Sequence, residues 1–508
     1  MKVITVLIFL ALVLGIFYQV APVSAQDDPP EFSIQTFWAR VTPSVFFCDA
    51  IGGMTIEVHV VGRKDVARVR IMDPRGDTFA SAGSFYKYFS YLYDDGTNGD
   101  AVAGDNVFTR SGLRPYCPNE NEQTKNGIGF GSWGYGTWDY YPFFELKDGT
   151  LQGSYYPIRI ALVDPQYRGV FQVKDFGNGL SATAYAFFIE DPKNEVFSGY
   201  PISDIYCARP NAEAYRKLYS VLPDAFDMAM VTPGMQMLKD TGGFLENIPY
   251  ALTVANDVRN IGMKIEDNSA QFGSAGRLRM VIYNSFGGLD VVDHEIGHMW
   301  GVQIGSKLGL TQADRTDFLD AYHWNVNSDT GGQMQLFYIG DSGFGHFVPN
   351  SDGSTWRFVD NISVNADQPY SPLELYVMGL IGPEEVPPIR IFTSPPDMTD
   401  SQRVTVAAYK TITIQDIIEA EGGERIPSVA DSPKNFTLAY IVAQDIPYDE
   451  AAYAYHSLMA YHLTSKLPPE TRASNGQPSQ LRFFMPFYWA TGGRATLETR
   501  LPVDLPDP

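Results

Sequence analysis

The sequence predicts an α+β protein in which an N-terminal antiparallel β-sandwich precedes a mixed α/β domain. From Phe32 to about Val163, short runs alternate apolar and polar residues between Gly and Pro turns, which is typical of half-buried antiparallel strands. After an acidic turn at 190–194, apolar runs and helical periodicity replace this alternation. The 508 residues, 44% of them hydrophobic, suffice for two to four domains of roughly 150 residues each. We expect the sandwich to occupy 26–170.

The N-terminus predicts export. Lys2 is followed by an apolar run from Val3 to Val20, and Val23-Ser24-Ala25 places small residues where a signal peptidase reads the chain. We expect a signal peptide over 1–25, cleaved after Ala25, and a secreted, extracellular protein with no stable membrane span. The alternative is an uncleaved anchor, because the apolar run approaches the roughly 20 residues that span a bilayer.

The charge excludes one class of partner. With 59 acidic and 37 basic residues, the formal net charge is -22. Such a chain repels nucleic acid and anionic lipid, so neither is expected as a main partner. A protein or peptide remains the expected partner.

The cysteines allow at most one intramolecular disulfide, because the chain has three of them. Cys48 and Cys117 fall in the same predicted domain, so we expect them to pair. Cys207 is then a buried thiol.

Within the predicted sandwich, Thr55–Val60 reads as a strand, and a loop rich in Asp and Gly follows at 94–105. Such a loop could wrap a calcium ion, although its spacing is not that of an EF-hand and an ordinary turn is the alternative. It resembles a DDGxxGDxxAGDxxYT-type loop of immunoglobulin-like modules in secreted bacterial proteins, with Phe108 in the aromatic place. That resemblance implies an immunoglobulin-like sandwich. The candidate calcium ligands are Asp94, Asp95, Asn98, Asp100 and Asp105.

The second domain begins with strand signals. Ala225–Val231 reads as a strand that ends at Thr232-Pro233-Gly234. Arg277–Tyr283 reads as another, closed by a turn at Gly287-Gly288, and a helix is expected to open at Leu289. A further helix is expected over 449–466.

The helix after Leu289 contains His294-Glu295-Ile296-Gly297-His298, which is an HExxH motif. At about 100° per residue, the two histidines project from one face, a turn apart, where both can reach one metal ion. Glu295 lies beside that face, which suits a carboxylate that accepts a proton from a metal-activated water. The opposite, core-facing side carries Val292, Ile296, Met299 and Trp300.

This motif resembles the active-site helix of the zincin metallopeptidases. The resemblance implies a tetrahedral zinc ion with three protein ligands and a water, and Glu295 as general base. The chain departs from two familiar patterns for the third ligand. The metzincin position is Ile304, and the thermolysin-like position is Phe318.

The third ligand is therefore open. His323, which is 25 residues after His298, is preferred because a neutral imidazole is a ready zinc ligand and the chain has just seven histidines. Glu374 is the alternative, and its other reading is an acceptor for the free N–H of a ligand or a carboxylate near a helix N-terminus. Asp317 or Asp320 is the remaining choice.

The resemblance extends beyond the motif. His323-Trp324, the run from Ser371 to Leu380 and the closing Ala490–Leu497 together resemble a set of largely uncharacterised secreted bacterial and archaeal HExxH proteins. It covers roughly residues 200–500 and implies one zincin-like catalytic unit over 171–508, including its C-terminal subdomain.

Other residues have supporting roles in this reading. An oxyanion donor is required, and Tyr376, Tyr322 and His346 are the candidates. Met378 is expected in the core, and the alternative is a place beneath the metal, as in a Met-turn. His59, His456 and His462 are expected to be structural.

Two functions from different classes follow. The first is a secreted zinc endopeptidase that hydrolyses peptide bonds with a metal-activated water and Glu295 as general base. The alternative is a non-catalytic extracellular binding or surface protein that metal ions stabilise. Hydrolysis of another amide or an ester is a third reading.

Overall fold

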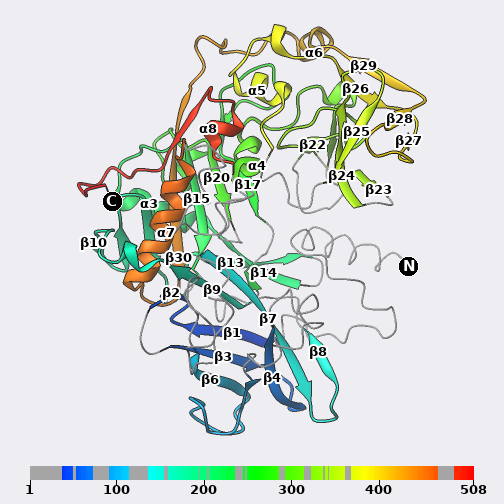
Figure 1. The fold of residues 1–508 in the computed structure, drawn as a ribbon. Coiled ribbons are helices and arrows are strands. Elements are labelled where there is room, and N and C mark those ends of the chain that lie inside the picture. The colour runs from blue at the N-terminus through cyan, green and yellow to red at the C-terminus, as the bar shows by residue number, and fades with distance from the viewer. Residues whose placement is uncertain are drawn as a thin grey trace.

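The computed structural model describes residues 37–49, 53–72, 91–113, 136–153, 158–193, 195–202, 205–234, 244–245, 249–284, 292–313, 322–335, 338–340, 343–360, 368–466 and 485–507. The predicted signal peptide and its cleavage site after Ala25 lie outside this part, as do Cys117, Asp317 and Asp320. The described part combines many strands with few helices, so the predicted α+β class is confirmed. Figure 1 shows the arrangement, with the N-terminal strands in blue and cyan.

Two sheets enclose one apolar core in the N-terminal part. The predicted strand at Thr55–Val60 is present, and its alternation places Ile56 and Val58 in that core. The first sheet has the order β1 (Phe37–Thr42), β3 (Met54–Val60), β6 (Val107–Leu113), and the second has β2 (Val45–Phe47), β9 (Ile158–Val163), β7 (Gly136–Leu146), β4 (Val66–Met72), β5 (Tyr91–Leu92), with β8 (Leu151–Gly153) on β7.

The sequence predicts antiparallel sheets in this part of the chain, but the structure contains one parallel pair of strands. β2 runs parallel to β9, with Val45 opposite Ala161. The reason is the short passage from β1 to β2, because the chain crosses from one sheet to the other between Thr42 and Val45. Strand alternation predicts which face is buried but carries no information on strand direction.

A mixed eight-stranded sheet forms the centre of the molecule. Its middle strands are parallel and apolar on both faces, which is typical of a sheet covered on both sides; they are β12 (Ala186–Glu190), β30 (Asn435–Gln444), β15 (Met228–Pro233) and β20 (Met280–Tyr283). Alternate residues of β15 enter different cores, with Met230 on one side and Val231 on the other. The order is β10 (Lys174–Gly177), β11 (Leu180–Ala182), β12 (Ala186–Glu190), β30 (Asn435–Gln444), β15 (Met228–Pro233), β20 (Met280–Tyr283), β17 (Tyr250–Thr253), with β31 (Thr496–Glu498) on β30.

The two strands predicted at the start of the second domain are present but begin three residues later than expected, at Met228 and Met280. Before β20, the backbone N–H groups of Arg277 and Leu278 donate to the side chains of Asp224 and Ser274 and not to a strand. Side chains of this kind compete with ladder hydrogen bonds and shorten a strand. Apolar periodicity alone does not reveal that competition.

Helices cover both faces of the central sheet. α3 (Ala212–Val221) packs into the core on one face, and α4 (Val292–Gly297), α5 (Pro372–Met378) and α7 (Glu450–Leu463) pack on the other. α7, orange in Figure 1, confirms the helix expected over 449–466, and the side chain of Asp449 caps its N-terminus. In the described part, no helix has the length and apolar character needed to cross a membrane.

Smaller elements surround this centre. A second, smaller apolar core lies among the strands drawn in yellow-green in Figure 1. It is formed by Phe347, Trp356, Phe358, Phe392 and Val404. The remaining elements are β13 (Phe197–Ile202), β14 (Ile205–Pro210), β16 (Phe244–Leu245), β18 (Ala255–Asn256), β19 (Glu266–Asp267), β21 (Thr311–Ala313), β22 (Tyr322–Trp324), β23 (Tyr338–Gly340), β24 (Gly343–Pro349), β25 (Trp356–Asp360), β26 (Ile389–Phe392), β27 (Pro396–Asp397), β28 (Thr405–Val406), β29 (Tyr409–Ile412), α6 (Ile414–Glu421), α8 (Phe487–Ala490) and the 3-10 helices Pro165–Tyr167, Ser269–Phe272, His298–Trp300, Ser306–Leu308 and Pro383–Glu385.

The N-terminal sheets pack directly on the central unit. Phe47 and Val163, at the edge formed by β2 and β9, belong to the same apolar cluster as α7. An ion pair joins Arg40 Nη2 to Asp445 Oδ2 at 2.9 Å across this contact. The chain changes from one sheet system to the other between Val163 and Lys174.

Cys48 is disulfide-bonded and buried. The predicted pairing with Cys117 stays a prediction, because Cys117 lies outside the described residues. The side chain of Cys207, on β14, also lies outside them.

His456 has the structural role that the sequence predicts, and it makes stability sensitive to acid. It is buried on α7 against Phe188, Tyr440 and Tyr455, and neither ring nitrogen has a hydrogen-bond partner among the described residues. Burial lowers the pKa of His456 to about 3.

The unfolded chain therefore takes up a proton on this histidine, at a pKa near 6.5, before the folded chain does. We expect the contribution of neutral His456 to be complete above pH 6.5 and to fall as the pH drops toward 3, by up to about 1.4 kcal/mol per pH unit. Urea denaturation between pH 7 and 4 should show a shallower decline for His456→Leu. Parallel profiles for the two proteins would contradict this prediction.

Candidate metal centre

The HExxH segment is shorter as an α-helix than expected. α4 ends at Gly297, and the chain tightens into a 3-10 turn at His298–Trp300 before Gly301, whose φ of 63° ends the helix. The predicted start at Leu289 lies outside the described residues. The predicted core face is buried, and it comprises Val292, Ile296, Met299 and Trp300.

Three histidines converge at this helix. His294 and His298 are joined by His323 from β22, and each of the three offers a ring nitrogen within 4.8 Å of the other two. The Nε2 atoms of His294 and His323 lie 3.2 Å apart. The preferred third ligand of the sequence analysis is therefore brought to the pair, 25 residues beyond His298 in the chain.

All three imidazoles are held in the neutral form. Burial lowers the pKa of His294, and it lowers the pKa of His298 well below the usual value, with the neighbouring rings adding to the effect. The pKa of His323 falls to about 3, mainly through burial. A neutral imidazole has a free lone pair, which is the form that binds a metal ion.

One hydrogen bond orients His294. Its Nδ1 lies 2.6 Å from the backbone oxygen of Gln333. Because a carbonyl only accepts, this nitrogen carries the proton, and the lone pair of Nε2 faces the other histidines. Such a partner fixes the tautomer that ligation requires.

Glu295 lies in a dry environment. It is 4% exposed, and its Oε2 has no hydrogen-bond partner among the described residues. Burial raises the pKa of Glu295 to about 8. A carboxyl group with a pKa near neutrality is suited to accept and release a proton during a reaction.

Glu374 is not a member of the histidine group, so its alternative role as third ligand receives no support. Its two oxygens accept hydrogen bonds from Trp324 Nε1 and from the backbone N–H groups of Gln333, Met334 and Ser371. A carboxylate has about four acceptor positions, and these donors use them. Met378, at the other end of α5, is buried as expected.

The three candidate oxyanion donors have different surroundings in the structure. The Tyr376 hydroxyl accepts the backbone N–H of Arg425 at 3.1 Å, which leaves its own O–H to donate, so its role as an oxyanion donor stays a prediction. His346 on β24 is buried next to Gln368 Nε2, and burial lowers its pKa to about 4, so its ring is neutral. The side chain of Tyr322 lies outside the described residues.

Sequence reasoning missed Gln333 and Gln368. The side chain of Gln333 donates to the backbone oxygen of Gln368, whose own side chain contacts His346, so a chain of contacts runs from His294 to His346. No local pattern marks these two residues, because each acts through a contact distant in the sequence.

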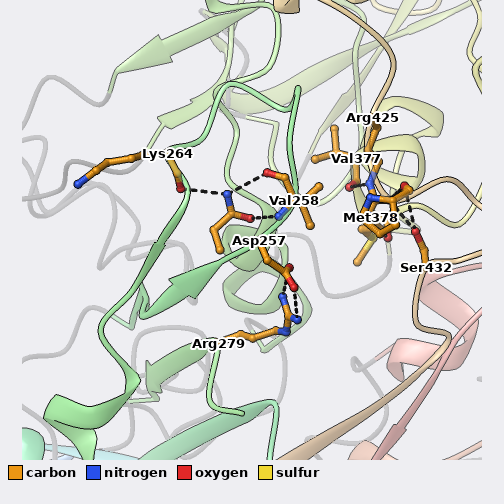
Figure 2. A network of polar contacts seen from close by, with 10 residues as sticks. Asp257, Val258, Lys264, Arg279, Val377, Met378, Arg425 and Ser432 are labelled. Atoms are coloured by element: carbon orange, nitrogen blue, oxygen red, sulfur yellow. Dashed lines mark hydrogen bonds and ion pairs between the residues drawn. The ribbon is translucent and has the colours of Figure 1, made fainter. Parts of the chain in front are cut away.

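Arg425 fixes the C-terminal end of α5 (Figure 2). Its guanidinium donates to the backbone oxygens of Val377 and Met378 and, through Nη1, to Ser432 Oγ at 2.6 Å. It is 6% exposed, and burial lowers its pKa to about 10. The free carbonyls at the end of a helix favour a cation there.

The acidic loop brings three of its five candidate calcium ligands together, namely Asp94, Asp100 and Asp105. Asp94 already accepts three backbone N–H groups of the loop, and Asp100 accepts two. Asp95 and Asn98 are outside the group and bond to Thr97. The carboxylates of Asp94 and Asp100 thus stabilise the loop by hydrogen bonds to its own backbone, and calcium binding there stays a prediction.

Comparison with models of known protein families, with curated proteins and with solved structures gives no match.

Proposed function

We propose that this protein is a secreted zinc-dependent endopeptidase. The observation that carries the proposal is the convergence of three histidines, His294, His298 and His323, beside Glu295, whose buried Oε2 has no hydrogen-bond partner among the described residues. Three histidines are a known set of protein ligands for catalytic zinc, in which water or substrate takes the fourth position. In this proposal residues 171–508 form a zincin-like metallopeptidase domain, and residues 26–170 form an immunoglobulin-like module.

The surroundings of the histidines fit a peptide substrate. β17 is the last strand of the central sheet among the described residues, antiparallel to β20. It adjoins the HExxH segment, because Thr253 Oγ1 donates to the backbone oxygen of His298 at 3.1 Å. An extended peptide could pair with such an edge by backbone hydrogen bonds, which favours a peptide over a small ester.

Each residue then has a defined task. Zinc held by the three histidines supplies Lewis-acid activation of water and of the substrate carbonyl. Glu295 accepts the proton that water loses as its oxygen attacks the carbonyl carbon, and it returns that proton to the nitrogen of the leaving amine as the C–N bond breaks. The dry surroundings of Glu295 favour its protonated form after the first transfer.

The alternative is a non-catalytic extracellular protein in which the histidines hold a structural metal ion. A purely structural metal site requires no general base, so it would not need a carboxylate at the position of Glu295. A buried carboxyl group without a full set of partners costs stability, so its retention favours catalysis.

Metal content tests the proposal. We expect purified protein from residue 26 onward to hold about one zinc ion per chain by elemental analysis, and His323→Ala to lose it, because two histidines leave the ion with too few ligands. His59→Ala is the matched control, since His59 is a half-buried histidine of β3 stacked on Trp38. Folded wild-type protein that retains no zinc would contradict the proposal, and zinc without casein digestion would favour the binding protein.

A further inference from the structure

Glu374 has more hydrogen bonds than its place in a helix requires. It is the third residue of α5, where it forms a capping box with Ser371, and its Oε2 accepts the Ser371 N–H at 2.6 Å. Capping needs that bond alone. The same carboxyl group also accepts Trp324 Nε1 at 2.9 Å, Met334 N at 2.7 Å and Gln333 N at 3.1 Å.

These additional donors lie next to the candidate ligands. Gln333 is the residue whose carbonyl accepts His294 Nδ1, and its N–H is held by Glu374. Trp324 directly follows His323 in β22, and its indole N–H is held by the same carboxyl group. One side chain therefore connects the partner of the first histidine with the strand that carries the third.

The packing leaves little freedom in this arrangement. Glu374 is 4% exposed and Trp324 is 1% exposed. A Cβ atom at Gly332, where φ is +88°, would overlap Glu374 Oε2, so the loop at 331–334 can approach the carboxyl group this closely only with glycine at this position. The backbone N–H of Trp324 donates to the Met334 oxygen at 3.0 Å, which ties the loop to β22 a second time.

We propose that Glu374 is a positioning residue, which holds the Gln333 carbonyl and β22 so that His294 and His323 meet in the geometry that binds zinc. The inference rests on the proposed function, because it assigns Glu374 a role in that same metal centre. It differs from the ligand role that the sequence left open, because here Glu374 acts through Gln333 and Trp324.

The test compares zinc affinity in wild type and Glu374→Gln by competition with a chelator. An amide nitrogen cannot accept, so the variant loses part of its bonds to the loop and to Trp324. We expect zinc to bind about 10- to 100-fold more weakly, the usual effect of losing a residue that orients metal ligands. With cobalt at saturation, the absorption bands should keep their wild-type positions, because the ligand set is unchanged.

Asp416→Asn is the matched control. Asp416 is the third residue of α6 and forms the same capping box with Thr413, but it is exposed and, among the described residues, makes no bond to a segment of the metal centre. It makes the same change from carboxyl to amide at the same helix position, and its zinc affinity should equal that of wild type.

The outcomes separate the two proposals. Wild type that binds no zinc overturns the proposed function and this inference with it. Wild type that binds zinc, with Glu374→Gln binding equally tightly, leaves the metal centre standing and overturns the positioning role. Shifted cobalt bands in Glu374→Gln also overturn it, because they indicate direct ligation. If Glu374→Gln does not fold, Trp324→Phe replaces it, with weaker zinc binding supporting the role and unchanged binding overturning it.

Discussion

Glu295→Gln should lower the rate of peptide hydrolysis by about 10²- to 10⁴-fold, the usual contribution of a general base, while the protein keeps its zinc. Gln has nearly the shape of Glu but cannot accept a proton from water. Glu295 is also outside the histidine group, so its replacement removes no candidate ligand. The measurement is casein digestion beside zinc analysis of the same preparation.

Stability provides a second readout for this variant. The carboxyl group of Glu295 is buried, and its Oε2 has no hydrogen-bond partner in the part of the chain that the structure describes. Burial raises the pKa of Glu295 to about 8, so the ionised carboxylate lowers the stability of the folded state. A neutral amide removes that cost, and we expect Glu295→Gln to be at least as stable as wild type in urea at pH 8. Full casein digestion by Glu295→Gln would contradict the assignment of the base, and loss of zinc would contradict its position outside the ligand set.

The part of the site that follows from the sequence is the part that local geometry determines. The spacing of His294 and His298 puts them on one face of an α-helical turn, and α4 supplies that turn before it ends at Gly297. The same periodicity identified Ile296 and Trp300 as core residues, and both are buried. His323 has no such geometric signal, and the sequence favours it because a neutral imidazole is a ready zinc ligand and histidines are few.

The remaining features depend on contacts between distant segments. Gln333 lies 39 residues from His294, and its role is made by a backbone oxygen, which any residue could supply. Tyr376 has the right chemistry for an oxyanion donor, but that its hydroxyl also accepts the backbone N–H of Arg425, 49 residues away, depends on the packing of α5. The parallel pairing of β2 with β9 likewise depends on which sheet the chain enters after Thr42. None of these has a signature in a short sequence window.

Arg425→Met should produce the largest loss of stability among these variants, about 3 to 4 kcal/mol in the free energy of unfolding. Met fills similar space but donates no hydrogen bond. The carbonyls of Val377 and Met378 and the hydroxyl of Ser432 then lose the donor that Arg425 supplies in a buried place (Figure 2). Each bond from a charged donor contributes about 1.5 to 3 kcal/mol, partly offset because the guanidinium no longer has to be desolvated. Urea denaturation of the two proteins measures the difference.

Arg279→Met is the control, because it removes an arginine from the same region of the structure without removing buried bonds. Arg279 Nη2 lies 2.8 Å from Asp257 Oδ2, but the Asp257 side chain is 66% exposed (Figure 2). Exposed ion pairs are screened by water and salt, so we expect this variant to lose less than about 1 kcal/mol.

Since Arg425 fixes the end of α5, and Glu374 stands at its beginning, Arg425→Met should also weaken zinc binding, whereas Arg279→Met should not. Equal losses of stability in the two variants would show that the cap of α5 contributes no more than a surface ion pair.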